Sequence, residues 1–236
     1  MGVVCEELSK YSTCDISDGL LNFCNIEDGG FFPNLTRWSG NDSKETVAGK
    51  AYTVLFAPID DPREAVNYID SVPEGSFLVI SLTKDLQSHH APYVRITQAV
   101  YGGLMSTRAQ YLKSEASAVF GRIRDLQEHQ QLKHSVFSYG LSSCGPNKVV
   151  KPVAVNVSLT ILINDGSEKV IYPGDHIIGD VHGIVRIPSA KVDLEKLLDY
   201  VKVSVKADEL VAQDITFGVP AKQAQKDRRV ILKSFR

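Results

Sequence analysis

The chain has 236 residues, of which 43% are hydrophobic and 23% are charged, and its formal net charge is −2 at pH 7. This composition is typical of one large globular domain and excludes a protein-wide basic field for nucleic acid. No apolar run reaches the roughly 18 residues of a membrane span, and the first residues carry neither a basic leader nor an apolar signal core, so we expect a cytoplasmic protein without membrane contact.

The first half of the chain alternates predicted helices and strands. Helical spacing of apolar residues, strand-like recurrence of β-branched residues and polar breaks define the segments. In chain order they are helices at 5–10 and 17–24, an exposed polar loop at 37–45, a strand at 49–57, a helix at 63–72, a strand at 77–82, a helix opening at 102–105 and a strand at 117–120. The pattern predicts mixed α and β structure.

The second half is predicted to be rich in sheet and to end in a helix. Strands are expected at 152–163, 169–172, 176–179 and 183–187, with tight turns at Asn164-Asp165-Gly166 and Val181-His182-Gly183. Apolar residues keep helical spacing from 192 to 205. We predict a single domain over residues 1–220, followed by a basic tail at 221–236 that carries six Lys or Arg against one Asp.

An arginine and a carboxylate stand side by side where the strand at 117–120 ends. Arg124 can bind a carboxylate or keto oxygen, and Asp125 can hold a divalent cation. In a strand–helix–strand unit the strand ends and the helix start lie on one edge of the sheet, so we expect residues 102–105 near this pair. Because a helix start offers unpaired N–H groups to anions, the sequence predicts a site for a small anionic ligand.

Three stretches add a more specific pattern. Residues 12–20 form a Ser/Thr-rich turn followed by Ser-Asp-x-Leu, residues 121–125 read Gly-x-x-Arg-Asp, and residues 173–188 combine Pro-Gly-Asp, Gly-Asp and Gly-Ile-Val-x-x-Pro. With this combination the chain resembles the class II pyruvate aldolases that cleave 4-hydroxy-4-methyl-2-oxoglutarate, which are homologous to the regulator of ribonuclease activity A. The resemblance runs from residue 12 to about residue 210.

The resemblance implies an α/β protein with a three-layer β/β/α swivelling-type fold, assembled as a homotrimer or hexamer. It also implies a site in which Asp125 holds Mg²⁺ or Mn²⁺ and Arg124 binds a small 2-oxo acid substrate. Gly102, Gly103, Leu104 and Met105 would bind the substrate carboxylate through the helix start. Arg124 and Asp125 would then be the catalytic residues for aldol cleavage to pyruvate, and oxaloacetate decarboxylation would follow from the same pyruvate enolate.

The sequence departs from the family pattern in two places. Family members commonly carry an acidic residue after the first glycine of the helix-opening loop, whereas this chain has Gly103, so any role of that side chain is missing or moved. The segment 83–100, which contains His89-His90, is longer than its counterpart and stands where a lid over the site would lie.

Other interpretations of these residues stay open. Asp125 can be the cap of a helix at 126–132 with Arg124 in a surface ion pair, and Gly102-Gly103 can be an ordinary turn. A non-catalytic regulator that binds a protein partner is the second function class, and the retention of Asp125 favours the enzyme.

The remaining polar motifs favour structural roles. We interpret Asp180, His182 and Gly183 as a hairpin end rather than a metal site, and His89-His90 as a polar loop rather than zinc ligands. The four cysteines have no Cys-x-x-Cys pair and are expected to be buried or half-buried free thiols. For the basic tail, binding of RNA or an acidic partner is the alternative, and we favour a solvated end.

Overall fold

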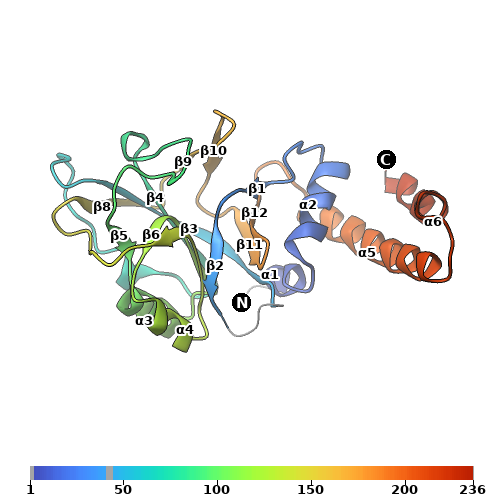
Figure 1. Ribbon diagram of the computed structural model, residues 1–236, viewed down its shortest axis with the longest axis horizontal. Coiled ribbons are helices and arrows are strands. Elements are labelled where there is room, and N and C mark those ends of the chain that lie inside the picture. The colour runs from blue at the N-terminus through green and yellow to red at the C-terminus, as the bar shows by residue number, and fades with distance from the viewer. Residues whose placement is uncertain (1–2, 41–44, 236) are drawn as a thin grey trace.

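A mixed β-sheet forms the body of the protein in the computed structural model, which describes residues 3–40 and 45–235 (Figure 1). Within these residues ten strands follow the order β1-β12-β11-β3-β4-β6-β7-β2, with β5 beside β6 and β8 beside β3. The strands are β1 (Phe31–Phe32), β2 (Thr36–Ser39), β3 (Val47–Pro58), β4 (Ser76–Leu82), β5 (Ala99–Tyr101), β6 (Ala116–Ile123), β7 (Ser135–Leu141), β8 (Val150–Val155), β11 (His176–Asp180) and β12 (Gly183–Ile187). A separate hairpin pairs β9 (Leu159–Leu162) with β10 (Glu168–Ile171).

Helices cover the sheet at two places. The helices are α1 (Val3–Leu8), α2 (Thr13–Asn22), α3 (Gly103–Tyr111), α4 (Leu126–Gln131), α5 (Leu194–Thr216) and α6 (Ala221–Arg228), with short 3-10 segments η1 (Ile69–Ser71), η2 (Lys84–Leu86) and η3 (Arg229–Phe235). Figure 1 shows α3 and α4 at one end of the molecule and α2, α5 and α6 at the other. The β9–β10 hairpin packs on the sheet through Leu159 and Ile161. The predicted mixed α/β fold is confirmed.

Both faces of the sheet are covered at strand β4. All seven of its residues are buried, and alternate side chains enter different cores. Leu78, Ile80 and Leu82 pack in the core that also holds Met105 of α3, whereas Phe77 and Val79 pack against the β9–β10 hairpin. A run of apolar residues buried on both faces is typical of a central strand in parallel pairing, and β4 pairs in parallel with both β3 and β6.

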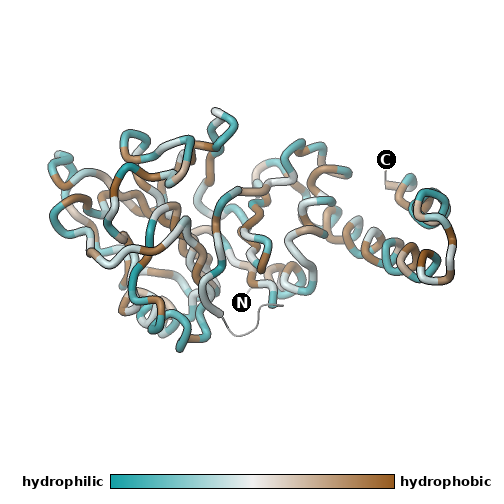
Figure 2. Tube along the Cα trace, in the orientation of Figure 1, coloured by the Kyte–Doolittle hydropathy of each residue, from teal (hydrophilic) through white to brown (hydrophobic). Residues whose placement is uncertain are grey.

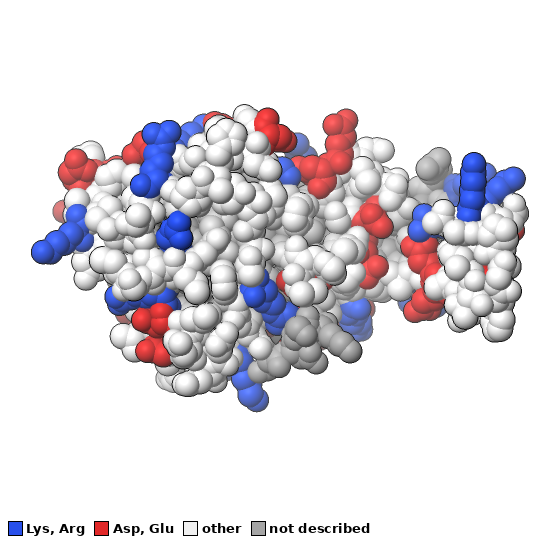
Figure 3. Space-filling model, viewed as in Figure 1, with Lys and Arg blue, Asp and Glu red and all other residues white. Residues whose placement is uncertain are grey.

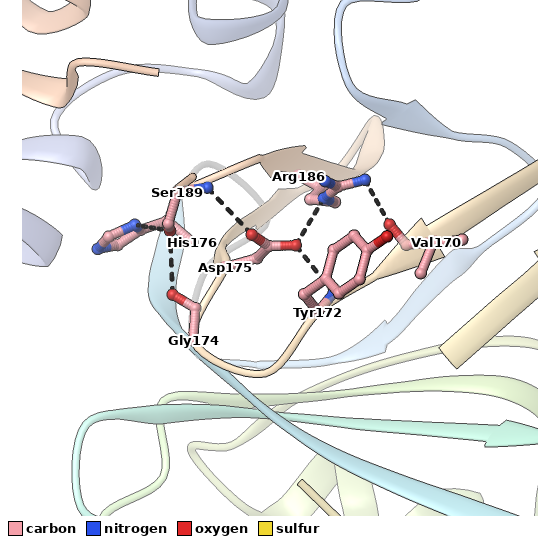
Figure 4. Close-up of polar contacts among 7 residues, drawn as sticks. All are labelled: Val170, Tyr172, Gly174, Asp175, His176, Arg186 and Ser189. Atoms are coloured by element: carbon pink, nitrogen blue, oxygen red, sulfur yellow. Dashed lines mark hydrogen bonds and ion pairs between the residues drawn. The ribbon is translucent and has the colours of Figure 1, made fainter. Parts of the chain in front are cut away.

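The Pro-Gly-Asp motif stabilises the turn before β11 (Figure 4). Asp175 is 3% exposed, and its carboxylate accepts hydrogen bonds from Nε of Arg186 at 2.7 Å and from the amides of Tyr172 at 2.9 Å and Ser189 at 3.0 Å. Arg186 also donates to the carbonyl oxygen of Val170. Because all of these partners lie within the chain, this aspartate has a structural role.

The Gly-Asp motif joins the β11–β12 hairpin to the start of α2. The buried carboxylate of Asp180 accepts from the amide of Thr13 at 2.8 Å, from Oγ1 of Thr13 at 2.7 Å and from the amide of His182 at 2.8 Å. Asp180 pairs with Gly183 at the end of the hairpin. The interpretation of Asp180, His182 and Gly183 as a hairpin end is confirmed.

The last helices form an arm that extends from the sheet (Figure 1). Apolar residues of α5 such as Leu197 and Val201 pack against α1, α2, β11 and β12, and the brown and teal segments of Figure 2 alternate along the arm. Residues predicted as a basic tail form α6 and η3. Figure 3 shows Lys and Arg side chains gathered at the end of the arm, where Arg228 pairs with Asp214 and Arg229 with Asp208, each at 2.7 Å.

Several predicted boundaries hold and others need correction. The strands predicted at 49–57, 77–82 and 183–187 are confirmed as β3, β4 and β12. The loop predicted at 37–45 begins inside β2, and residues 41–44 of it lie outside the described part of the chain. The strand predicted at 152–163 is two strands, because Asn156 adopts a left-handed conformation with φ 52° between β8 and β9.

The helix predicted at 63–72 is wrong. Only η1 is helical there, and the backbone before it pairs with another segment, since the amide of Val66 donates to the carbonyl of Pro152 at 2.9 Å. Tyr68 is then buried against Phe56. Tertiary contacts override the local helical spacing of these apolar residues.

Candidate functional site

The start of α3 and the end of β6 meet at one edge of the sheet, as the strand–helix–strand order predicts. The amide of Arg124 donates to the carbonyl of Tyr101 at 3.0 Å, which fixes the two strand ends side by side. The amide of Gly103, the first residue of α3, donates to Oδ2 of Asp125 at 3.2 Å. The same oxygen lies 3.4 Å from Nε of Arg124. The structure therefore brings Gly102, Gly103, Arg124 and Asp125 together.

Asp125 precedes α4 without capping it through its side chain. Its backbone is left-handed, with φ 64° and ψ 47°, and its carbonyl oxygen accepts from the amide of Glu128 at 3.0 Å. No hydrogen bond from the carboxylate to the first turn of α4 is present. Asp125 is therefore the N-cap residue of α4 by position, as that interpretation expects, but its side chain faces the start of α3 and makes no capping hydrogen bond.

A cavity of about 230 Å³ opens beside this pair. Its polar groups include Arg124, Asp125 and Asn147, and its apolar wall includes Phe56 and Met105. The guanidinium of Arg124 lies against Gly145, next to the lining residues Pro146 and Asn147, since a Cβ on Gly145 would lie only 2.9 Å from Nη1. The space is suited to a small polar molecule with an apolar part.

Gly102 and Gly103, at the start of α3, let neighbouring side chains approach the backbone closely and do not supply an unusual backbone conformation. Gly102 is extended, with φ −141° and ψ 178°, so the alternative of a positive-φ turn does not apply. A Cβ on Gly102 would lie 2.7 Å from Oδ2 of Asp125, and a Cβ on Gly103 would overlap the carboxylate of Glu128. The site therefore depends on missing side chains at both positions.

The helix start offers fewer free amides than the sequence suggests. The amide of Gly103 is engaged by Asp125, and that of Met105 donates to the carbonyl of Gly102 at 3.0 Å. Among the residues that the structure describes, the amide of Leu104 has no acceptor. Leu104 and Met105 both line the cavity. The amide of Leu104 is thus free to bind an anion.

A chain of buried hydrogen bonds lies beneath the site. Nδ1 of His129 lies 2.8 Å from Oγ of Ser106, which donates to the hydroxyl of Tyr101 at 3.2 Å. The hydroxyl of Tyr101 also lies 3.0 Å from Oγ of Ser117, and that Oγ lies 2.8 Å from Nε2 of His134. Burial lowers the pKa of His129 and lowers the pKa of His134 to about 4, so both imidazoles are neutral at pH 7. These hydrogen bonds connect α4, α3, β5 and β6, and no sequence motif predicts them.

The donor set around Asp125 fits a hard divalent cation held largely by water. Mg²⁺ in proteins commonly uses one or two carboxylates and keeps several waters. Asp125 has a partly exposed carboxylate at the cavity, and no group of three or more His, Cys, Asp or Glu residues suited to a metal occurs in the described residues. Asp125 would hold such a cation, and a zinc site of three or four protein ligands finds no support in the same part of the chain.

The histidine loop lies against another element. Nδ1 of His89 is 2.6 Å from the carbonyl oxygen of Ile163, beyond β9, and neither His89 nor His90 lines the cavity. The side chain of Gln87 binds the same hairpin through the carbonyl of Thr160 at 2.8 Å and the amide of Leu162 at 2.9 Å. This loop therefore covers β9. The four cysteines are free thiols, as expected, but only Cys5 and Cys24 are buried or half-buried, whereas Cys14 and Cys144 are exposed.

Comparison with known proteins identifies the fold family. The model of the RraA-like family, described as Aldolase/RraA, matches residues 13–186. The chain belongs to this RraA-like family. The matched residues include the Thr13–Asp180 contact, the start of α3 and the Arg124–Asp125 pair. Within the described residues no helix is long and apolar enough to cross a bilayer.

Individual RraA-like relatives are distant. Protein DlpA of Legionella pneumophila is 26% identical over 227 residues, which cover 94% of this chain and 33% of DlpA, so the chain spans about one third of that relative. An uncharacterised protein from Pseudomonas syringae superposes with a TM-score of 0.74 at 23% identity, covering 95% of this chain and 98% of that one. Streptomyces coelicolor RraAS2, an unusual member of the RNase ES inhibitor RraA family, has a TM-score of 0.68 at 18% identity over 89% and 95% of the chains. These structures share the fold.

Proposed function

We propose that this RraA-like protein is a divalent-metal-dependent aldolase that cleaves 4-hydroxy-4-methyl-2-oxoglutarate to pyruvate and also decarboxylates oxaloacetate. The observation that carries the proposal is the meeting of Arg124, Asp125 and the start of α3 at one small cavity. The RraA-like family contains both lyases and RNase inhibitors. Only the lyases need a cation-binding carboxylate beside an arginine.

Arg124 would bind the oxygens at the pyruvate end of the substrate. Its guanidinium reaches the cavity between Asp125 and Gly145, and a planar fork suits a carboxylate or keto oxygen. The free amide of Leu104 would take a second carboxylate oxygen at the positive end of α3. These contacts would hold the substrate so that the bond to be broken has a fixed position relative to Asp125.

Asp125 would hold Mg²⁺ or Mn²⁺ at the same edge. A bound cation supplies positive charge for the keto oxygen as the bond breaks. Arg124 donates to the same developing charge, and a donor of this kind is typically worth about 3–4 kcal/mol of transition-state stabilisation. The neutral His129 and Ser106 below the site hold α4 and α3 in register without adding competing charge.

The test is pyruvate release from both substrates. Native protein and Asp125→Asn would be assayed with Mg²⁺ or with EDTA, and we expect turnover that requires both the metal and Asp125. Borohydride with pyruvate should leave activity intact, because no Schiff base is involved; a covalent adduct with loss of activity argues against the metal mechanism. Absence of turnover in folded, metal-supplemented protein would favour the alternative of a non-catalytic regulator that binds a protein partner.

We also infer, from family membership, that the protein assembles as a homotrimer or hexamer. The arm leaves apolar side chains uncovered in the single chain, since Phe217 directly after α5 is 87% exposed and Leu210 and Ile215 of α5 are exposed too. Apolar surface of this kind is typical of a subunit contact. Sedimentation of the full chain checks the stoichiometry, and a monomer at micromolar concentration contradicts it.

A further inference from the structure

Glu128 occupies the side-chain space that Gly103 leaves empty. Glu128 lies in the first turn of α4, and its side chain packs against Gly103, the first residue of α3. A Cβ on Gly103 would overlap Oε2 of Glu128 and would lie 2.6 Å from its Cβ. A carboxylate from α4 therefore stands where a side chain at position 103 would stand.

The same glycine also contacts the carboxylate of Asp125. Its amide donates to Oδ2 of Asp125 at 3.2 Å, while its Cα faces Glu128. Glu128 follows the left-handed backbone of Asp125 by three residues, and its carboxylate also lies at Gly103. Two carboxylates thus converge on Gly103, and one of them, that of Asp125, also lines the cavity.

A divalent cation beside Gly103 would be attracted by both carboxylates. The positive end of the α3 dipole offsets part of the negative charge of the two carboxylates, but the amide of Gly103 already donates to Asp125. Magnesium sites commonly use one or two carboxylates with several waters, which matches this pair. We propose that Glu128 is the second carboxylate of the divalent-cation site, and that position 103 is glycine because Glu128 fills its side-chain space. The proposal rests on the proposed function, since it concerns the same cation.

The geometry suggests a test in which the carboxylate is moved from position 128 to position 103. Gly103→Asp alone should be disruptive, because the new side chain would collide with Glu128. In the double variant Gly103→Asp/Glu128→Ala the collision is removed, and a carboxylate returns to the same space from α3. Glu128→Gln keeps the shape of the side chain and removes its charge, so it tests the proposal even if the double variant fails to fold.

The experiment measures Mn²⁺ binding to the full chain without substrate, by electron paramagnetic resonance of free Mn²⁺, beside thermal unfolding of each variant. We expect Glu128→Gln to bind Mn²⁺ about 10–100-fold more weakly, and the double variant to recover affinity relative to Glu128→Ala. Glu195→Gln is the matched control, because Glu195 stands in the first turn of α5 and the same charge is removed. It should bind Mn²⁺ as native protein does.

Unchanged Mn²⁺ affinity in folded Glu128→Gln would overturn the proposal and leave Glu128 as an ordinary first-turn charge. A native protein that binds no Mn²⁺ would overturn it too. Pyruvate release that needs Asp125 but not Glu128 would keep the proposed function and reject this inference. Conversely, Mn²⁺ binding that depends on Glu128 without any turnover would keep the inference and reject the aldolase.

Discussion

The amide of Gly103 and the carboxylate of Asp125 meet across 3.2 Å, joining the start of α3 to the turn before α4. This contact links two segments separated by 22 residues, and it orients the carboxylate toward the cavity rather than toward its own helix. Substitutions that change this contact should affect the site more than the fold.

Gly102→Ala should lower activity with little loss of stability. The backbone of Gly102 is extended and accepts alanine, but the added Cβ would lie 2.7 Å from Oδ2 of Asp125 and would displace it. We expect at least a tenfold fall in kcat, in the range that misplacing a catalytic group by about 1 Å can produce. Gly140→Ala is the control, because its Cβ would meet Arg122 at an ordinary 3.4 Å. Equal activity of the two variants would contradict the prediction.

Arg124→Lys should not preserve activity. A lysine keeps the positive charge but lacks the planar fork that binds two oxygens, and its shorter reach leaves the contact with Gly145 empty. We expect kcat/KM for oxaloacetate to fall by about 10²–10³, with the melting temperature near that of native protein. Activity within a factor of three of native would show that only charge matters at this position.

Asp180→Ala should destabilise the fold. The substitution leaves the amide and hydroxyl of Thr13 and the amide of His182 without their buried acceptor. We expect a loss of about 3 kcal/mol in the free energy of unfolding. Urea denaturation measures it, and Asp165→Ala in the exposed turn between β9 and β10 should cost clearly less. A similar midpoint for both variants would refute the structural role of Asp180.

Stability should fall in mild acid because of His134. Burial lowers its folded pKa to about 4, while an unfolded histidine titrates near 6.5, so the unfolded chain takes up the proton first. The contribution is fully present above about pH 6.5 and is lost progressively toward pH 4, by about 3 kcal/mol in total. Comparing urea midpoints at pH 7 and pH 5 for native protein and His134→Gln separates this group from the carboxylates. An identical pH dependence in both would contradict the prediction.

Much of the site followed from local sequence rules. The apolar run ending at residue 120 and the glycines at 102 and 103 placed a strand end and a helix start on one edge, and the structure brings Arg124 and Asp125 to that edge. The alternation of Leu78 and Val79 between two cores is the period-2 rule for strands. These features depend only on near neighbours in the chain.

Other features depend on segments that meet only in the folded protein. Gly145 supports Arg124 from a loop after β7, and Glu128 fills the space at Gly103 from a different helix. Neither contact has a periodic or motif signal. His129 and His134 also look like isolated polar residues in the sequence, yet both belong to one buried hydrogen-bond chain. Such packing relations cannot be deduced from spacing along the chain.

The left-handed backbone of Asp125 has an evolutionary consequence. Glycine adopts φ 64° more readily than aspartate, so the local conformation alone would favour glycine at this position. Loss of the carboxylate would therefore remove the proposed cation ligand while relieving local strain. A single Asp125→Gly substitution would keep a backbone conformation that glycine accepts, so a scaffold of this kind can give rise to non-catalytic binding proteins without first losing its fold.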